Sequence, residues 1–440
     1  MPLKMTLRCI AMAKKHLASL LCVLSILFLP GLLMAQGKTD TLRFEDHVYK
    51  DYIKSVQIHQ IGWKFSPPLI ALHSGDRLQL DFDDLAGDYI QYSYTLVHCD
   101  ANWEPSDITP FDYLGGFSED MITDYSYSFN TFQKYTHYRL VFPNSNIQML
   151  LSGNYLLKVY KDNNPDSLII TRRVMVYESQ VMIHGRERRG IGDEAITKQE
   201  IVFNINTSRA NVVNASQSLD VVISQNGRWD NEIIGLQPQY IQDTGLIYDM
   251  DEGNVFNGGN EFRSFDMTSL KYLGDHEAEF VKNPNADEVN LTRDEPRAGG
   301  DYFTFADLDG QYLIYDKDDD STPINSQYVF VNFYLSMDSE ITTGNVYIFG
   351  ALTDWQCLPD FQLHYNQQRH AYMGTAYLKQ GYYEYEYACL PKGSKVASLS
   401  YIEGSHFETT NTYYIYVYYR PLGVFYDKLI GFTTVHAPGN

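Results

Sequence analysis

The 440-residue sequence contains 55 acidic and 34 basic residues, which gives a formal net charge of −21 at pH 7. Phosphate binding needs a basic surface, so this composition excludes nucleic acid as a partner. The chain has 36 tyrosines and only four tryptophans, and its Val, Ile and Thr runs add further residue types that favour β-strands.

The first 35 residues have the pattern of a secretory signal peptide. Four basic residues precede an apolar run from Leu17 to Leu33, and a small-residue site follows at Ala35. A retained membrane anchor is the alternative, because the run approaches the length that spans a bilayer, but Pro30 interrupts it just before the cleavage site. We therefore expect cleavage near Ala35 and an exported mature chain with 30 basic and 55 acidic residues.

No later segment reaches about 18 uninterrupted apolar residues, so the sequence predicts no transmembrane helix and no direct membrane insertion of the mature chain. Roughly 405 residues after the signal exceed what one core usually supports. We predict an all-β fold of tandem immunoglobulin-like β-sandwich domains with few helices. The predicted divisions are an N-terminal β-sandwich over 36–180, a middle β domain over 181–323 and a C-terminal immunoglobulin-like β-sandwich over 324–440.

Strands in the first domain follow each other at the spacing typical of a sandwich. In Asn154–Tyr160, Tyr155, Leu157 and Val159 take one face of the strand and the intervening residues take the other. Turn-forming residues follow this strand, so we expect it to form a hairpin with the next one. The predicted strands are Ser55–Ile61, Arg77–Phe82, Ile90–His98, His137–Val141, Asn154–Tyr160 and Thr171–Tyr177.

A dense basic run, His184–Gly190, interrupts this pattern, and we interpret it as a solvated loop or linker, with a contact point as the alternative. Strands are predicted beyond it at Glu200–Ile205, Leu219–Ser224 and Phe262–Met267. The acidic loop Asp316–Asp320 separates this middle region from the last one.

The last region contains five predicted strands, two of which are unusually rich in tyrosine. In Tyr382–Cys389 three tyrosines share one face, whereas Tyr382, Glu384 and Glu386 share the other, which we expect to be solvated. Tyr413–Tyr419 is aromatic on both faces, so we expect a central strand, with coverage by a partner as the alternative. The five strands are Tyr328–Leu335, Gly344–Gly350, Ala371–Leu378, Tyr382–Cys389 and Tyr413–Tyr419.

His98, Cys99 and Asp100 invite a cysteine-nucleophile interpretation, because a thiolate needs a nearby base. Consecutive side chains on a strand point to opposite faces, however, so His98 cannot activate Cys99 directly. We predict a buried cysteine and a structural histidine. The mature cysteines are Cys99, Cys357 and Cys389, and a disulfide between the last two is an open alternative.

Two acidic groups offer oxygen ligands of the kind that calcium uses, but neither follows the EF-hand pattern. We interpret them as solvated turn residues, with calcium binding left open. The groups are Asp81, Asp83, Asp84 and Asp88, and Asp307, Asp309, Asp316, Asp318, Asp319 and Asp320.

The segment Gly344–Trp355 looks like the opening of immunoglobulin-like sugar-binding modules, in which a strand leads to a loop that carries Trp. An exposed Trp355 could stack on a sugar ring. Core packing is the favoured interpretation, and an exported carbohydrate-binding β-sandwich protein is the alternative function.

Taken in order, several stretches resemble the plug protein family of the type IX secretion system. They are Ala86–Asp88, Tyr94–Trp103, Pro105–Asp107, Phe111–Phe117, Asp124–Thr131, Tyr135–Tyr138, Ser152–Tyr160, Tyr418–Pro421 and Leu429–Gly431. The resemblance implies a non-enzymatic periplasmic plug. Its partner would be the large outer-membrane translocon β-barrel, whose periplasmic mouth it seals when no substrate is passing. The resemblance assigns no catalytic, cofactor-binding, metal-binding or partner-binding residue, and we expect no cofactor.

Overall fold

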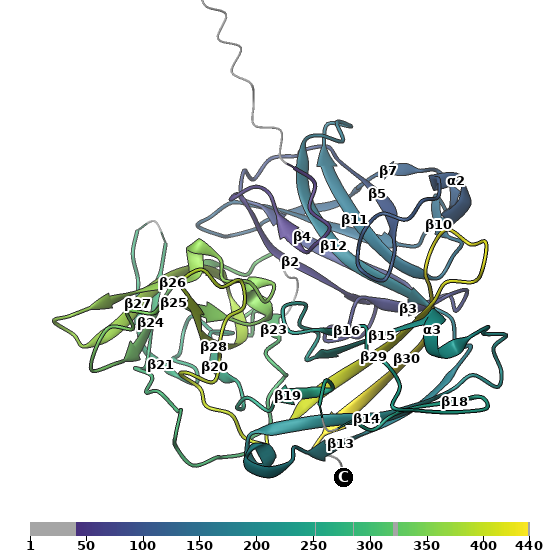
Figure 1. The fold of residues 1–440 in the computed structure, drawn as a ribbon. Coiled ribbons are helices and arrows are strands. Elements are labelled where there is room, and N and C mark those ends of the chain that lie inside the picture. Colours follow the sequence, from purple (N-terminus) through teal and green to yellow (C-terminus); the bar gives the residue numbers. More distant parts are fainter. Residues whose placement is uncertain (1–40, 251, 285, 320–323, 439–440) are drawn as a thin grey trace, which may run out of the picture. The chain divides into compact units, whose positions relative to one another are not determined.

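All of the predicted strands are present in the computed structural model, which describes residues 41–438 except 251, 285 and 320–323 (Figure 1). The predicted signal peptide, residues 1–35, lies outside the described residues. Helices in the described chain are short: α2 (Pro110–Tyr113), α3 (Ala215–Ser218), η1 (Gly192–Ile196), η2 (Ala351–Thr353) and η3 (Pro359–Phe361). The predicted all-β fold of sandwich domains with few helices is confirmed. The immunoglobulin-like topology stays a prediction.

The first sandwich consists of two sheets that enclose one core, in which Leu80, Phe82 and Tyr94 are among the buried side chains. β11 and β12 form the predicted hairpin. One sheet has the order β1 (His47–Val48), β12 (Leu168–Tyr177), β11 (Gly153–Lys161), β5 (Tyr92–Cys99), β7 (Glu119–Met121), with β3 (Leu69–Ala71) beside β12. The other has the order β2 (Ile53–Gln60), β4 (Leu78–Asp84), β9 (Thr136–Phe142), β8 (Asp124–Tyr127), and a small ribbon pairs β6 (Leu114–Gly116) with β10 (Ile147–Met149).

The second sandwich combines strands from two distant parts of the chain. One sheet contains β13 (Met182–Arg189), β14 (Lys198–Asn206), β18 (Gly245–Tyr248) and β17 (Tyr240–Gln242), with β19 (Val255–Asn257) beside β14. The other has the order β16 (Ile233–Ile234), β15 (Leu219–Gln225), β29 (Asn411–Tyr419), β30 (Lys428–Ala437). The interpretation of His184–Gly190 as a loop is wrong, because most of it belongs to β13, which pairs with β14 along its whole length.

β29 is the predicted central strand, and the chain itself covers both of its faces. Tyr413 and Ile415 pack into the core of the second sandwich, whereas Tyr416 and Tyr418 pack against the outer face of the first. The Tyr418 hydroxyl donates to Asn154 Oδ1 over 2.9 Å, which satisfies its polar end. The aromatic side chains on both faces are therefore explained without a partner.

The third region is a nine-stranded sheet that turns back on itself around a core. Phe265 of β20 lies 5.7 Å from Phe333 of β24, measured between ring centres, although the two strands stand far apart in the sheet order. The order is β20 (Arg263–Asp266), β28 (Gly381–Pro391), β25 (Gly344–Phe349), β26 (Gln362–Asn366), β27 (Ala371–Lys379), β24 (Tyr328–Ser336), β22 (Glu288–Leu291), β21 (Glu277–Val281), with β23 (Tyr312–Ile314) beside β28.

Strands from the predicted middle and C-terminal regions share two sheets. β15 pairs with β29 along its length, and β20 and β23 both pair with β28. The division into 36–180, 181–323 and 324–440 stays a prediction, and the pairing shows that hydrogen-bonded ladders join the two sides of residue 323.

The face of β28 that we expected to be solvated is buried, so that expectation is wrong. Glu384 and Glu386 are 0% and 1% exposed. The Glu384 carboxylate accepts the backbone N–H groups of Leu308 and Gly310 over 2.8 and 3.0 Å. A loop that lies far away in sequence covers this face, which the alternation of residue types could not reveal.

Candidate docking surface

β8 forms the outer edge of its sheet and exposes all four of its residues. The Ser128 N–H donates to Tyr135 O over 2.8 Å, which fixes the alternation of hydrogen-bonded pairs along this hairpin. The backbone groups of Tyr125 and Tyr127 therefore point away from β9. Among the described strands only β9 pairs with β8, so these groups are open to another extended chain.

Several exposed aromatic side chains lie on or near β8. Tyr125 lies 4.8 Å from Tyr89 and 5.7 Å from Tyr127 between ring centres. Phe129, in the turn after β8, is 69% exposed, and Phe132 is 56% exposed. We define the aromatic edge as Tyr89, Tyr125, Tyr127, Phe129 and Phe132. A cluster of exposed large apolar side chains on a protein surface often marks an interaction site.

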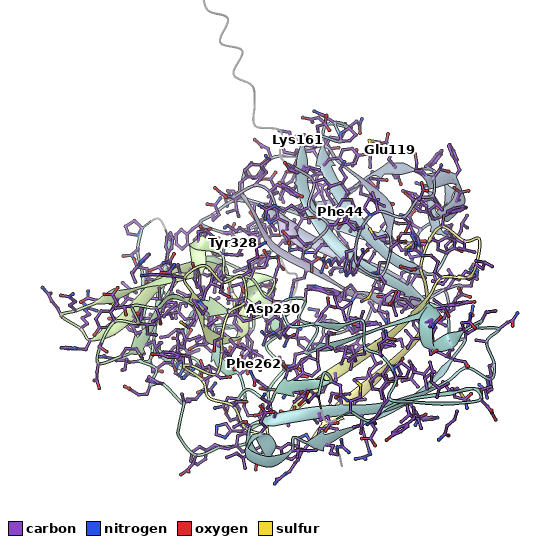
Figure 2. The ribbon with its side chains drawn as sticks, in the orientation of Figure 1. Phe44, Glu119, Lys161, Asp230, Phe262 and Tyr328 are labelled. Carbon is purple, nitrogen blue, oxygen red and sulfur yellow. The ribbon has the colours of Figure 1, made fainter. Side chains whose placement is uncertain are left out.

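Acidic residues flank the aromatic edge. Asp88 and Asp124 are exposed and adjoin Tyr89 and Tyr125 in the sequence. Glu119, labelled in Figure 2, and Asp120 lie a few residues earlier in β7, the edge strand of the other sheet. A partner strand that carries Lys or Arg would be complementary to this border. The arrangement offers backbone hydrogen bonds, aromatic contact and charge complementarity within one short segment.

Exposed apolar loop tips form a second group on the surface. Leu422 in the turn between β29 and β30 is fully exposed, and Phe111 of α2 is 90% exposed. Two ion pairs hold the turn in place: Arg420 contacts Asp100 at 2.6 Å and Asp427 at 2.8 Å. These tips offer contact area but no free strand edge.

His98 and Cys99 lie on opposite faces of β5, as predicted. Burial lowers the pKa of His98 to about 4, and its Nδ1 lies 2.9 Å from Ser106 Oγ. Burial raises the pKa of Cys99 to about 12 and leaves the thiol in an apolar cluster. A base with so low a pKa and a thiol with so high a pKa cannot form a nucleophile pair near neutral pH.

Trp355 is buried, with 6% of its surface exposed, and it packs edge-on against Phe262 and Phe349. The Arg228 guanidinium lies 5.6 Å from the centre of its ring. The prediction of core packing is confirmed. The exposed indole that motivated a carbohydrate-binding function is therefore not present in this loop.

The interpretation of the acidic groups as solvated is wrong for several members. Asp83 and Asp84 are completely buried, and Asp83 pairs with Lys379 at 2.6 Å. Asp307 accepts the Phe262 N–H over 2.7 Å, and Asp309 accepts the Thr412 hydroxyl over 2.7 Å. These acids fix loops and strand contacts. In the part of the chain that the structure describes, no group of three metal-ligating side chains is placed to hold an ion.

Cys99, Cys357 and Cys389 are free thiols in the structure. Burial raises the pKa of Cys357 to about 11 and also raises that of Cys389.

Within the described residues, no helix is long and apolar enough to cross a membrane.

Sequence reasoning missed the aromatic edge, although Asp124–Thr131 was among the stretches that carried the family resemblance. The run of Tyr125, Tyr127 and Phe129 at a spacing of two residues predicts one aromatic strand face. Nothing in the sequence showed that this strand would lie at the outer edge of its sheet.

Tandem β-sheets around separate cores, with an exposed aromatic strand edge, define an all-β protein suited to contacts with other proteins. A family model described as the type 9 secretion system plug protein 1st domain matches residues 53–178, which run from the first residue of β2 to just beyond β12. Through residues 53–178 the chain is identified with the type IX secretion system plug protein family. This is a secretion-system family rather than an enzyme family, and it associates the chain with the type IX secretion machinery of the cell envelope.

Similarity to a solved structure extends over the remaining sheets. The chain is 34% identical to a hypothetical protein from Parabacteroides merdae known from a crystal structure, with a TM-score of 0.86. The match covers 90% of this chain and 100% of the other. No curated protein matches the sequence.

Proposed function

We propose that this protein is a non-enzymatic periplasmic plug subunit. It binds the periplasmic mouth of the large outer-membrane type IX translocon β-barrel and seals the pore when no substrate is passing. The observation that carries the proposal is membership of the plug family, with the matched domain spanning the first sandwich. The signal-like N-terminus supports a periplasmic location after cleavage near Ala35.

Several structural features support this role. A pore wide enough for folded cargo would leak unless a rigid body closed it, and each sandwich here is built on a buried aromatic and aliphatic core. The aromatic edge offers a docking surface with both backbone and side-chain contacts. The acidic residues next to it in the sequence, Asp88 and Asp124, favour a basic partner segment, and this attraction weakens with salt, as a reversible contact requires.

The proposal is tested first by isolating the translocon from native outer membranes through an affinity tag. We expect this protein to co-purify, and its deletion to admit large antibiotics such as vancomycin that the outer membrane normally excludes. Absence from the isolated translocon, together with unchanged permeability in the deletion strain, would refute the plug role.

A second experiment tests the docking surface. Tyr127→Asp places a charge on a side chain that is 51% exposed, so the fold should tolerate it, whereas docking loses an aromatic anchor. We expect the amount that co-purifies to fall at least about tenfold. Tyr272→Asp is the matched control, because Tyr272 is 78% exposed and lies outside the aromatic edge. Equal recovery of both variants would show that docking uses another surface, while the plug role itself would stand.

A further inference from the structure

One carboxyl oxygen of Glu386, on β28, is buried without a hydrogen-bond partner among the described residues. The residue is 1% exposed, and the enclosed oxygen is Oε1. Burying a carboxyl group in this way costs several kcal/mol unless a donor satisfies it, and native proteins rarely leave such a group unpaired. The groups that surround the Glu386 carboxyl should therefore explain why it is buried there.

Neighbouring buried acids are fully bonded, which makes Glu386 the exception. Glu403, 0% exposed, accepts from Arg263 at 3.0 Å and from Arg297 at 2.7 Å, and also from the Tyr387 N–H. Glu384, on the same strand face as Glu386, accepts two backbone N–H groups. The same fold thus satisfies two carboxylates close to Glu386 and supplies no donor to the third.

Glu386 lines a pocket with a volume of about 240 Å³. The other walls come from the loop after β15, from the segment that includes β19, and from the loop after β28; Asp230 and Phe262, labelled in Figure 2, lie on two of them. Asn231 also lines the pocket, and its Oδ1 is a second buried acceptor without a described donor. Both residues line one pocket, so a ligand that donates there could satisfy the two acceptors.

The positive charges around Glu386 donate mainly to other groups. Arg228 donates to Asp230 over 3.0 and 2.8 Å and stacks on Phe349 and Trp355. Arg263 and Arg297 bond Glu403, and the remaining Arg297 Nη2 is buried without a described acceptor.

Burial, followed by the charge of Glu403, raises the pKa of Glu386 well above its ordinary value. The Glu386 carboxyl thus retains its proton near neutral pH until a cation arrives.

We propose that this pocket binds a guanidinium or ammonium group, with the Glu386 carboxylate as its charged partner and Asn231 Oδ1 as a second acceptor. The pocket is smaller than the 300–1,000 Å³ that is typical of drug-sized ligands, so its occupant is a single basic side chain or a small cation. Binding converts Glu386 from the neutral to the charged form, and the displaced proton goes to solvent. The proposal is independent of the plug role.

Isothermal titration with butylguanidinium tests the charge, because the isosteric N-butylurea provides a neutral control. We expect saturable binding of the cation in the millimolar range or tighter. At pH 7 binding should release a proton, which is detected as a difference in heat between buffers of unlike ionisation enthalpy. Glu386→Gln should weaken binding by at least about tenfold and abolish the proton release. Glu408→Gln, at an exposed acid with a 48% exposed side chain, should change neither.

An arginine-containing tetrapeptide, compared with its citrulline counterpart, separates the two sources of the cation. Binding of the peptide but not of butylguanidinium assigns the pocket to a partner's side chain, whereas binding of both assigns it to any small cation. Equal binding of butylguanidinium and butylurea, no saturable binding of either cation, or unchanged binding by a folded Glu386→Gln variant would overturn the proposal.

Discussion

Replacing Lys379 by Met removes one partner of a buried ion pair that connects the first sandwich with the nine-stranded sheet. The Lys379 ammonium lies 2.6 Å from Asp83, and both side chains are 1% exposed. Burial alone would raise the pKa of Asp83, but the charges of Lys379 and His137 outweigh it and hold that pKa below its ordinary value. Loss of Lys379 therefore removes the largest influence that lowers this pKa, and it leaves Asp83 buried without that counter-charge.

Breaking a buried pair by removing one partner costs about 3–5 kcal/mol. Asp83 keeps His137 at 2.8 Å and the Tyr328 hydroxyl at 2.7 Å, so we expect the lower end, about 3 kcal/mol. About 400 residues that unfold together, at about 2.1 cal/mol/K each, give an unfolding entropy of about 0.84 kcal/mol/K. The expected fall in Tm is therefore about 4 °C.

Differential scanning calorimetry at pH 7 measures this shift. Lys271→Met is the matched control, since the Lys271 side chain is 63% exposed, and it should leave Tm within about 1 °C. Adding Asp83→Asn to Lys379→Met removes the stranded charge, so the double variant should recover part of the loss. A Lys379→Met shift no larger than that of Lys271→Met would refute the claim that the buried pair holds these two parts together.

Three further predictions concern buried groups. Burial raises the pKa of Glu232 and of Glu384 to about 8, so the stability they contribute is complete below the unfolded pKa near 4.5 and is lost as pH rises through 8; Tm should fall between about pH 5 and pH 8, and a rise would contradict this. Gly153→Ala should cost about 1–3 kcal/mol in urea unfolding, because a Cβ would lie 2.6 Å from His98 Nε2 at a φ of +137°. Cys99 should not react with a thiol reagent at pH 8 until the protein unfolds, because its thiol is buried and its pKa is about 12; labelling at the rate of a free thiol would contradict its burial.

Local alternation was sufficient to predict strands but not the partners of those strands. β11 and β12 were placed correctly because turn residues between them fix a hairpin, and such a contact is short in sequence. β13 was missed because its basic residues do not resemble a buried strand, and it lies at the edge of its sheet with half of its residues exposed.

The site-level errors have one physical origin. Glu384 and Glu386 were expected in water because carboxylates seldom lie in cores, but loops about 75 residues earlier and about 15 residues later in the chain cover that face. Asp83 is buried for the same reason, since its counter-charge Lys379 is almost 300 residues away. Periodicity shows which side chains share a face, and only the tertiary fold shows what covers it.

The order of strands in the second sandwich constrains how the chain folds as it leaves the ribosome or crosses a membrane, N-terminus first. β15 can complete its ladder only when β29 is present, almost 200 residues later, and β30 pairs with β29. The first sandwich closes within its own segment and can form early. The second exposes an unfinished sheet until the last strands arrive. The intervening time is when this chain most needs a chaperone, and any truncation before residue 411 should produce a species that aggregates.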